Sequence, residues 1–266
     1  MKKLLTLLFF FSAFNSNAQR TMFGAQNNYV APVIPFQAPA VVTNGLVLLL
    51  DASNPNSYPG SGTTWTDLSV SGNVGTFVSG PTYSSSDGGT IVFNANSEYI
   101  SVANNASLNL TTAGTLSIWV KPNSLTQLAI TNFIGRTIDG GSGGQSYYLY
   151  WTGGKIYGII QNGGVYNNIS TPTPTVLGWY NYVFTWGNGF LNLYQNGVSV
   201  STPVATTINA QSLTTTVNIG GWIFGGAGGY NNSLNGIIPI VNMYNRDLTP
   251  AEVLFNFNAV KTRFGL

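Results

Sequence analysis

Apolar and polar positions alternate in short runs from about residue 43 to the end of the chain. The runs are rich in Val, Ile, Thr, Tyr and Phe, and Gly, Asn or Ser turns separate them at intervals of about ten residues, which is the pattern of antiparallel strands. Strands are expected at 90–93, 98–102, 147–151, 155–160, 179–186 and 217–220. A hairpin is expected across Asn196-Gly197, because both positions of a type I′ turn need a positive φ.

The last thirty residues change from a strand pattern to a helix pattern. A strand-like run at 237–244 precedes Thr249, Pro250 and Glu252. Thr249 and Glu252 have the spacing of a capping box, and proline suits the first helical position because its missing N–H costs nothing there. The spacing predicts a helix near 250–262. Its expected apolar stripe consists of Val253, Leu254, Phe257 and Val260.

Many short antiparallel strands with one short C-terminal helix indicate two packed sheets. We therefore expect an all-β protein, a two-sheet antiparallel jelly-roll sandwich that occupies residues 43–266. The sequence contains neither an internal repeat nor a second domain pattern.

The N-terminus resembles a secretory signal peptide. Lys2 and Lys3 precede an apolar run, and small residues end at Ala18, so cleavage is expected after 1–18. The apolar run is too short to span a bilayer, which needs about 20 residues. The mature protein is expected to be secreted, without a membrane span.

Residues 19–42 form a Pro-containing segment that is still apolar. Three prolines in it exclude a helix or a central strand. We expect an extended arm, which covers its own domain or docks on a neighbouring subunit and links a homo-oligomer, with a disordered segment as the third alternative. Its expected anchors are Val33, Ile34 and Phe36.

Charged residues make up only 6% of the chain, and cleavage after residue 18 leaves seven basic and seven acidic residues. Binding to nucleic acid needs clustered Lys and Arg, so no nucleic-acid partner is expected. Cysteine is absent, which leaves a hydrophobic core rather than disulfides to stabilise the fold. A polar, uncharged surface suits contact with glycans, although compositional bias of the source would give the same surface.

Three segments resemble one family. They are the closing strand and helix with Tyr244-Asn245-Arg246, the opening run GLVLLLD followed by SYPGSGTTW, and the run LSIWVKP at 116–122. All three resemble laminin-G-like jelly rolls of the concanavalin A-like lectin/glucanase group. The resemblance brackets residues 43–266 and implies the same sandwich fold. Function needs a separate argument, because it depends on sites that differ between members of a fold.

The residues needed for common catalytic sites are missing. Histidine and cysteine are absent, so the usual triads and zinc sites are excluded. Glycosidases use two facing carboxylates. The resemblance implies an E-x-D-x-x-E strand motif for glucanases. This chain has two glutamates, Glu98 and Glu252, and they do not form that motif. We therefore expect no enzymatic activity.

The resemblance also suggests Ca²⁺ as a ligand, because such domains often bind it through loop aspartates. Calcium needs six to eight oxygens, and the family's frequent acidic pair is replaced here by apolar residues at 238–241. Asp139 is the best remaining ligand and Asp87 the second, with an Asx turn as the alternative for each. Asp51 and Asp67 are expected to anchor loops. No cofactor is expected.

Aromatic residues supply the candidate binding site. In 147–151 the side chains alternate, so Tyr148 and Tyr150 share one sheet face. One face must fill the core, and the other can line a groove in which sugar C–H faces stack on rings. The candidate ligand-binding residues are Tyr148, Tyr150, Trp222 and Tyr230, with packing in the core or in loops as the alternative. Trp119 and Trp179 are expected to be packing residues.

The sequence thus predicts a secreted, non-catalytic recognition or adhesion module at the cell surface or outside the cell. The expected partner is a glycan or another cell-surface polymer. The alternative is a structural subunit of an extracellular appendage or virion surface, a jelly-roll brick tied to its neighbours by the N-terminal arm.

Overall fold

The computed structural model describes residues 40–94, 97–127, 130–137, 145–221, 223–224, 230–231 and 233–266. The chain divides into two units, Met1–Gln37 and Ala38–Leu266, and the fold is that of the second. The expected signal segment and the arm up to residue 39 lie outside the described residues.

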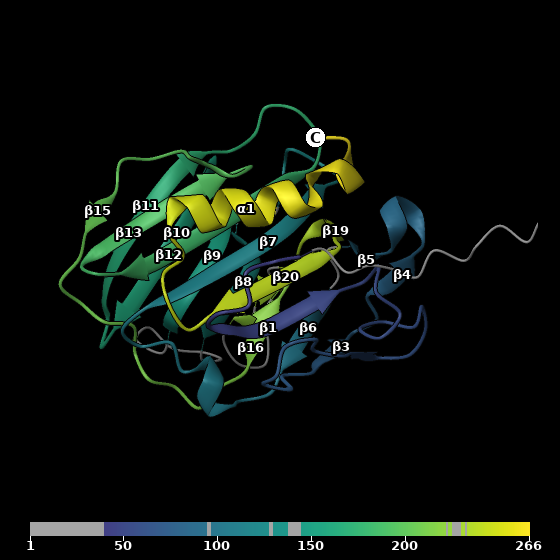
Figure 1. Ribbon diagram of the computed structural model, residues 1–266, viewed down its shortest axis with the longest axis horizontal. Helices are drawn as coiled ribbons and strands as arrows, with labels where there is room; N and C mark the ends of the chain where they lie inside the picture. The colour runs from purple at the N-terminus through teal and green to yellow at the C-terminus, as the bar shows by residue number, and fades with distance from the viewer. Residues whose placement is uncertain are drawn as a thin grey trace, which may run out of the picture. The chain divides into compact units, whose positions relative to one another are not determined.

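Two antiparallel sheets form the domain (Figure 1). The ten-stranded sheet contains β1 (Leu46–Asp51), β4 (Thr82–Ser84), β5 (Thr90–Asn94), β7 (Gly114–Pro122), β12 (Tyr180–Gly187), β13 (Phe190–Gln195), β14 (Val198–Ser199), β15 (Val204–Ala205), β19 (Asn235–Ile238) and β20 (Ile240–Tyr244). The eight-stranded sheet contains β2 (Thr64–Trp65), β3 (Gly75–Val78), β6 (Tyr99–Val102), β8 (Ile130–Thr137), β9 (Gln145–Thr152), β10 (Lys155–Asn162), β11 (Val165–Pro172) and β16 (Val217–Ile219).

Few other elements occur among the described residues. They are the two-stranded ribbon β17 (Ile223–Phe224) and β18 (Tyr230–Asn231), the short 3₁₀ helices η1 (Ser86–Gly88), η2 (Ala106–Leu108) and η3 (Lys261–Phe264), and the helix α1 (Pro250–Val260). No helix in the described part of the chain is long and apolar enough to cross a membrane. The two-sheet sandwich with one short C-terminal helix confirms the predicted fold class.

The core lies between the two sheets, and both contribute alternate side chains to it. Its buried members include Leu50, Phe93, Leu116, Tyr147, Phe184 and Trp186. The predicted hairpin at Asn196-Gly197 is confirmed, since φ is 52° at Asn196 and 78° at Gly197, as a type I′ turn requires.

The strand-like run at 237–244 is not one strand. Pro239 divides it into β19, which pairs with β5 and β7, and β20, which pairs with β1 and β7. Proline has no N–H to donate to a ladder, so the chain changes partners at that position. β7 lies between β12 and β20 and joins the C-terminal strands to the middle of the sheet.

The predicted helix cap is confirmed. Thr249 Oγ1 accepts from the Glu252 N–H at 3.3 Å, and the Thr249 N–H donates to Glu252 Oε2 at 2.9 Å. Leu248 and Val253 belong to one buried cluster on either side of the cap, which is a hydrophobic staple. Local sequence therefore fixes where α1 begins.

The predicted stripe of α1 is wrong at one position. Leu254 is 44% exposed, and Asn256 is buried in its place. The buried positions 253, 256, 257 and 260 follow the i, i+3, i+4, i+7 spacing, and Leu254 falls outside it. Asn256 is tolerated there because its amide is satisfied: Nδ2 donates to the Tyr244 hydroxyl at 3.0 Å, and Oδ1 accepts from the Val42 N–H at 2.8 Å.

The described end of the predicted arm lies on this domain. Val41 and Val42 pack against the cluster that contains Tyr244 and Val253, and Val42 makes the hydrogen bond to Asn256. Residues 41–42 therefore cover part of their own domain.

Helix α1 covers the outer face of the ten-stranded sheet (Figure 1). Trp119, on β7, stacks on Phe257 with ring centroids 5.5 Å apart and lies 4.6 Å from the Phe264 ring. Trp179 joins the same cluster, 4.4 Å from the Phe264 ring. Trp119 and Trp179 are thus packing residues, as expected, but they pack beneath the C-terminal helices instead of between the sheets.

The expected anchoring role of two aspartates is confirmed. Asp67 Oδ1 accepts from the Leu49 N–H at 2.8 Å, and its Oδ2 accepts from the Asn73 N–H at 2.8 Å. Asp51 Oδ1 accepts from the Ser53 N–H at 2.9 Å and from Arg263 Nη1 at 2.9 Å. Both carboxylates are used to hold loops.

Candidate functional site

The two faces of β9 differ as the alternation predicts. The core takes Tyr147, Leu149 and Trp151. Tyr148 and Tyr150 instead belong to a separate cluster on the outer face of the eight-stranded sheet. These two candidate binding residues are therefore on the same face and outside the core.

Neighbouring strands extend this cluster. In the ladder, Tyr157 of β10 lies opposite Tyr150. The Tyr150 ring centroid is 5.3 Å from that of Tyr148 and 5.5 Å from that of Tyr157. Tyr166 of β11 is close enough to influence the ionisation of Tyr148 and Tyr150. We call these four residues the tyrosine surface.

Exposure increases across the tyrosine surface from β9 to β11. Tyr148 is only 7% exposed, Tyr150 and Tyr157 are half-buried, and Tyr166 is 58% exposed. Tyr148 therefore supports its neighbours, while Tyr150, Tyr157 and Tyr166 present ring area to solvent. Sequence reasoning named Tyr148 and Tyr150 but missed Tyr157 and Tyr166, which the same alternation along 155–160 and the following strand could have indicated.

A glycine allows this packing. Gly135 of β8 pairs with Tyr148, and a Cβ at position 135 would lie 2.4 Å from the Tyr148 Cβ. Any larger residue at position 135 would displace Tyr148. The innermost ring of the tyrosine surface is thus set by a residue without a side chain.

The hydroxyls of Tyr148 and Tyr150 stay protonated at neutral pH. Burial raises the pKa of Tyr150 to about 12, and nearby Tyr157 and Tyr166 add to the rise. Burial also raises the pKa of Tyr148, with Tyr150 and Tyr166 adding to it. Phenol hydroxyls act as hydrogen-bond donors and acceptors, so the surface offers apolar rings with polar edges.

Polar side chains border the rings. Asn168 and Ser170 of β11 pair with Ile159 and Tyr157 of β10, and both are half-buried. They add an amide and a hydroxyl beside the rings. None of the six residues Tyr148, Tyr150, Tyr157, Tyr166, Asn168 and Ser170 has a charged side-chain type.

Other predicted site residues lie outside the described residues. Trp222, Asp139 and the arm anchors Val33, Ile34 and Phe36 have no described position. The backbone of Tyr230 belongs to β18, but its side chain is not described. Their predicted roles stay predictions.

Both glutamates have structural partners. Glu98 Oε2 accepts from the Asn94 N–H at 2.6 Å. Glu252 forms a two-pronged ion pair with Arg246, at 2.7 and 2.9 Å, and this pair lowers the pKa of Glu252 to about 2. Within the described ranges, no group of three or more His, Cys, Asp or Glu residues is placed to hold a metal ion.

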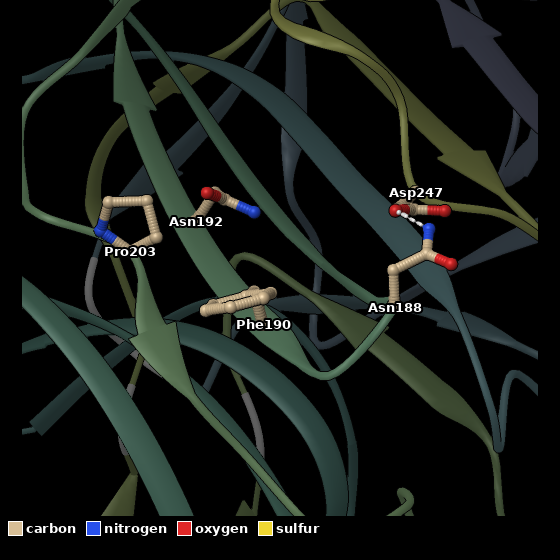
Figure 2. Close-up of a pocket in the computed structure, with 6 residues that line it drawn as sticks. Asn188, Phe190, Asn192, Pro203 and Asp247 are labelled. Atoms are coloured by element: carbon tan, nitrogen blue, oxygen red, sulfur yellow. Dashed lines mark hydrogen bonds between the residues drawn. The ribbon is translucent and has the colours of Figure 1, made fainter.

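A groove of about 260 Å³ lies on the other sheet, and sequence reasoning missed it (Figure 2). Its lining residues are Gly187, Asn188, Phe190, Asn192, Pro203 and Asp247. Phe190 and Asn192 come from β13, and Asp247 comes from the loop before α1, 55 positions further along the chain than Asn192. One signal in the sequence could have indicated it. Phe190 directly follows the turn, and strand alternation places its side chain on the face opposite to that of the core residue Leu191.

Comparisons with known proteins agree with this fold. A sequence profile of the concanavalin A-like lectin/glucanases superfamily matches residues 94–254, more than half of the chain. No curated protein matches the chain significantly in sequence.

Several solved structures share the fold. The binding domain of Paraclostridial Mosquitocidal Protein 1 is 18% identical, with a TM-score of 0.63 over 81% of this chain and 52% of its own. The botulinum neurotoxin serotype D ligand binding domain, in complex with N-acetylneuraminic acid, is 16% identical, with a TM-score of 0.62 over 82% of this chain and 51% of its own.

A third similar structure is shorter. Domain 4 of AbnA, a GH43 extracellular arabinanase from Geobacillus stearothermophilus, in complex with arabinotriose, is 19% identical. Its TM-score is 0.57 over 82% of this chain and 100% of that domain. This chain thus spans about half of the two toxin structures and all of the arabinanase domain. At these identities the similarity shows the fold, which is that of lectin-like binding domains.

Proposed function

We propose that this chain, which belongs to the concanavalin A-like lectin/glucanase superfamily, is a non-catalytic module that binds glycans outside the cell through the tyrosine surface. The observation that carries this proposal is the cluster of closely packed, partly exposed phenols on the outer face of the eight-stranded sheet.

The chemistry of the surface fits a carbohydrate. Sugars have apolar C–H faces and a rim of hydroxyls, so an aromatic ring with polar groups at its edge complements them. Tyr150, Tyr157 and Tyr166 supply rings and hydroxyls, and Asn168 supplies an amide. Rings that are already packed together lose little side-chain freedom when a ligand binds.

The similar structures support the same class of ligand. The arabinanase domain was solved with arabinotriose, and one toxin binding domain with N-acetylneuraminic acid. A related toxin binding domain was solved with rat synaptotagmin II. Glycans or other cell-surface molecules are therefore reasonable partners for a chain with this fold.

The non-catalytic part of the proposal rests on the carboxylates. Glycoside hydrolysis normally needs two carboxyl groups on either side of the scissile bond. Glu98 is 7% exposed and accepts a backbone hydrogen bond, and Glu252 is paired with Arg246. Neither glutamate is available as an acid or a nucleophile at the tyrosine surface.

Calorimetric titration with a panel of neutral oligosaccharides, arabinotriose included, tests the proposal. We expect Tyr166→Ala to weaken binding about tenfold, equivalent to about 1.4 kcal/mol. Phe255→Ala is the matched control, because Phe255 on α1 is a ring of similar exposure, 52% against 58%. Binding that weakens equally in both variants, or in neither, would contradict the assignment of the site.

A further inference from the structure

We propose that the groove beside the β12–β13 hairpin is a second binding site, which takes a single neutral sugar residue such as a chain end or branch. This inference depends on the proposed function in one respect, the choice of a sugar as the class of ligand. The groove lies on the ten-stranded sheet and the tyrosine surface on the eight-stranded sheet, so either site can fail a test without the other.

The floor of the groove is an exposed aromatic ring with an amide beside it. Phe190 and Asn192 are two residues apart on β13, so they point to the same side, while Leu191 and Leu193 point into the core. Phe190 is 48% exposed. Figure 2 shows the Phe190 ring and the Asn192 amide between Pro203 on one side and the Asn188–Asp247 pair on the other.

The polar wall is held in place. Asn188 Nδ2 donates to Asp247 Oδ2 at 2.8 Å (Figure 2). Asn188 and Gly189 form the two-residue turn of the hairpin, with φ of 50° and 81°, which fixes the Asn188 side chain at the rim. Gly187 is also needed, because a Cβ there would lie 2.7 Å from Asp247 Cγ.

The wall retains hydrogen-bonding capacity. Asp247 Oδ1 accepts no hydrogen bond from any residue that the structure describes, and neither of the two ion pairs among those residues involves Asp247. Asn192 Nδ2 makes only a long contact of 3.4 Å with Thr185 Oγ1. The residues that line the groove thus retain an unused carboxylate oxygen and an amide whose hydrogen-bond contact is long.

This combination selects a neutral sugar. Hydroxyl groups donate well to a carboxylate, and such charge-assisted bonds are the strong ones, while the C–H face of a sugar can lie on the ring. The charge of Asp247 disfavours uronic and sialic acids. A quaternary ammonium fits less well, because one ring beside two amides is no aromatic cage. The volume of about 260 Å³ lies just below the range of about 300–1,000 Å³ that is usual for ligand pockets, which limits the occupant to one sugar residue.

Amide chemical shifts of the labelled protein, titrated with glucose, galactose, arabinose, N-acetylneuraminic acid or choline, test the proposal. We expect at least one neutral sugar to shift the amides of 187–192 and 246–248 at millimolar concentration, and the two charged probes to have no effect there. The proposal would be overturned if none of the three neutral sugars changed these amide chemical shifts. It would also be overturned if choline or N-acetylneuraminic acid changed them as much as the neutral sugars do.

Variants sharpen the same titration. Phe190→Ala should abolish the response at the hairpin, whereas Phe190→Tyr should keep it, because the ring is retained. Asp247→Asn should weaken neutral-sugar binding about tenfold by removing one charge-assisted acceptor. A response that survives Phe190→Ala would sink the proposal. Tyr166→Ala should leave the hairpin response unchanged, so loss of polysaccharide binding in that variant concerns the tyrosine surface alone.

Discussion

Both sheets carry aromatic rings on their outer faces, but only one face is covered by the helix. On the ten-stranded sheet, Phe257 of α1 and Phe264 of η3 pack on Trp119, and the three side chains are 8%, 7% and 3% exposed. On the eight-stranded sheet, Tyr150 and Tyr157 keep partial access to solvent and Tyr166 is mostly exposed. Rings beneath the helix stabilise the fold, and rings left in contact with water are available to a ligand.

The covered face and the open face also differ in which aromatic side chains they carry. The covered cluster uses Trp and Phe, which have little or no polar edge to satisfy, whereas the other surface uses tyrosine, whose hydroxyl can remain in water. A large apolar surface exposed without a use is uncommon in proteins. The comparison therefore teaches that ring chemistry and coverage together separate the packing rings beneath the helix from the rings that remain open to solvent.

The largest expected effect is on the covered face. Phe257→Ala should lower the free energy of unfolding by about 3–5 kcal/mol, because it removes a buried ring stacked on Trp119. Urea denaturation measures the loss. The control is Leu254→Ala on the same helix, where exposure of 44% predicts a loss of about 1 kcal/mol or less. Equal losses in the two variants would show that α1 does not cover the sheet as described.

The next effect concerns the tyrosine surface. Tyr166→Ala should change the free energy of unfolding by no more than about 0.5 kcal/mol, as exposed substitutions do, while it weakens glycan binding about tenfold. The same protein sample can be used for denaturation and calorimetry. A stability loss comparable with that of Phe257→Ala would erase the contrast between the two faces.

A smaller effect depends on pH and concerns the cap that holds α1 on its sheet. The pKa of Glu252 is lowered from 4.5 to about 2 by the Arg246 pair. The ion pair therefore contributes stability above about pH 4.5 and loses it as pH falls toward 2. The pair is partly exposed, so its contribution is about 1 kcal/mol or less.

Urea denaturation of the wild type and of Glu252→Gln isolates this contribution. The difference between the two proteins should be present at pH 6 and shrink by pH 3. A difference that grows on acidification would show that the sign is wrong. Other carboxylates titrate equally in both proteins and cancel.

The smallest expected effect is that of chelation. EDTA should change glycan affinity little, because the tyrosine surface contains no carboxylate and calcium requires several. Calorimetry with and without EDTA measures this. A large loss of affinity would point to a calcium site, with Asp139 as its first candidate ligand.

Sequence alone predicted much of the fold because the signals were local. The Thr249–Glu252 cap, the Asn196-Gly197 turn and the alternation of 147–151 each depend on a few neighbouring residues. The exposure of Leu254 was not predictable in this way, because it depends on how α1 is rotated on the sheet. The break at Pro239 could have been predicted, since proline cannot donate to a ladder.

The sites were harder to predict because they combine distant segments. The tyrosine surface joins three strands in a register set by their turns, and only β9 carried an obvious aromatic alternation. The hairpin groove needs Asp247, whose place beside Gly187 follows from the path of the chain into α1. Spacing in sequence contains neither fact.

Amide hydrogen exchange with and without a saturating oligosaccharide, the strongest binder of the calorimetric panel, tests the central claim most directly. If the outer face of the eight-stranded sheet is the binding surface, protection will increase within 145–172 and remain unchanged within 250–264. Increased protection of 250–264, with none in 145–172, would contradict the account.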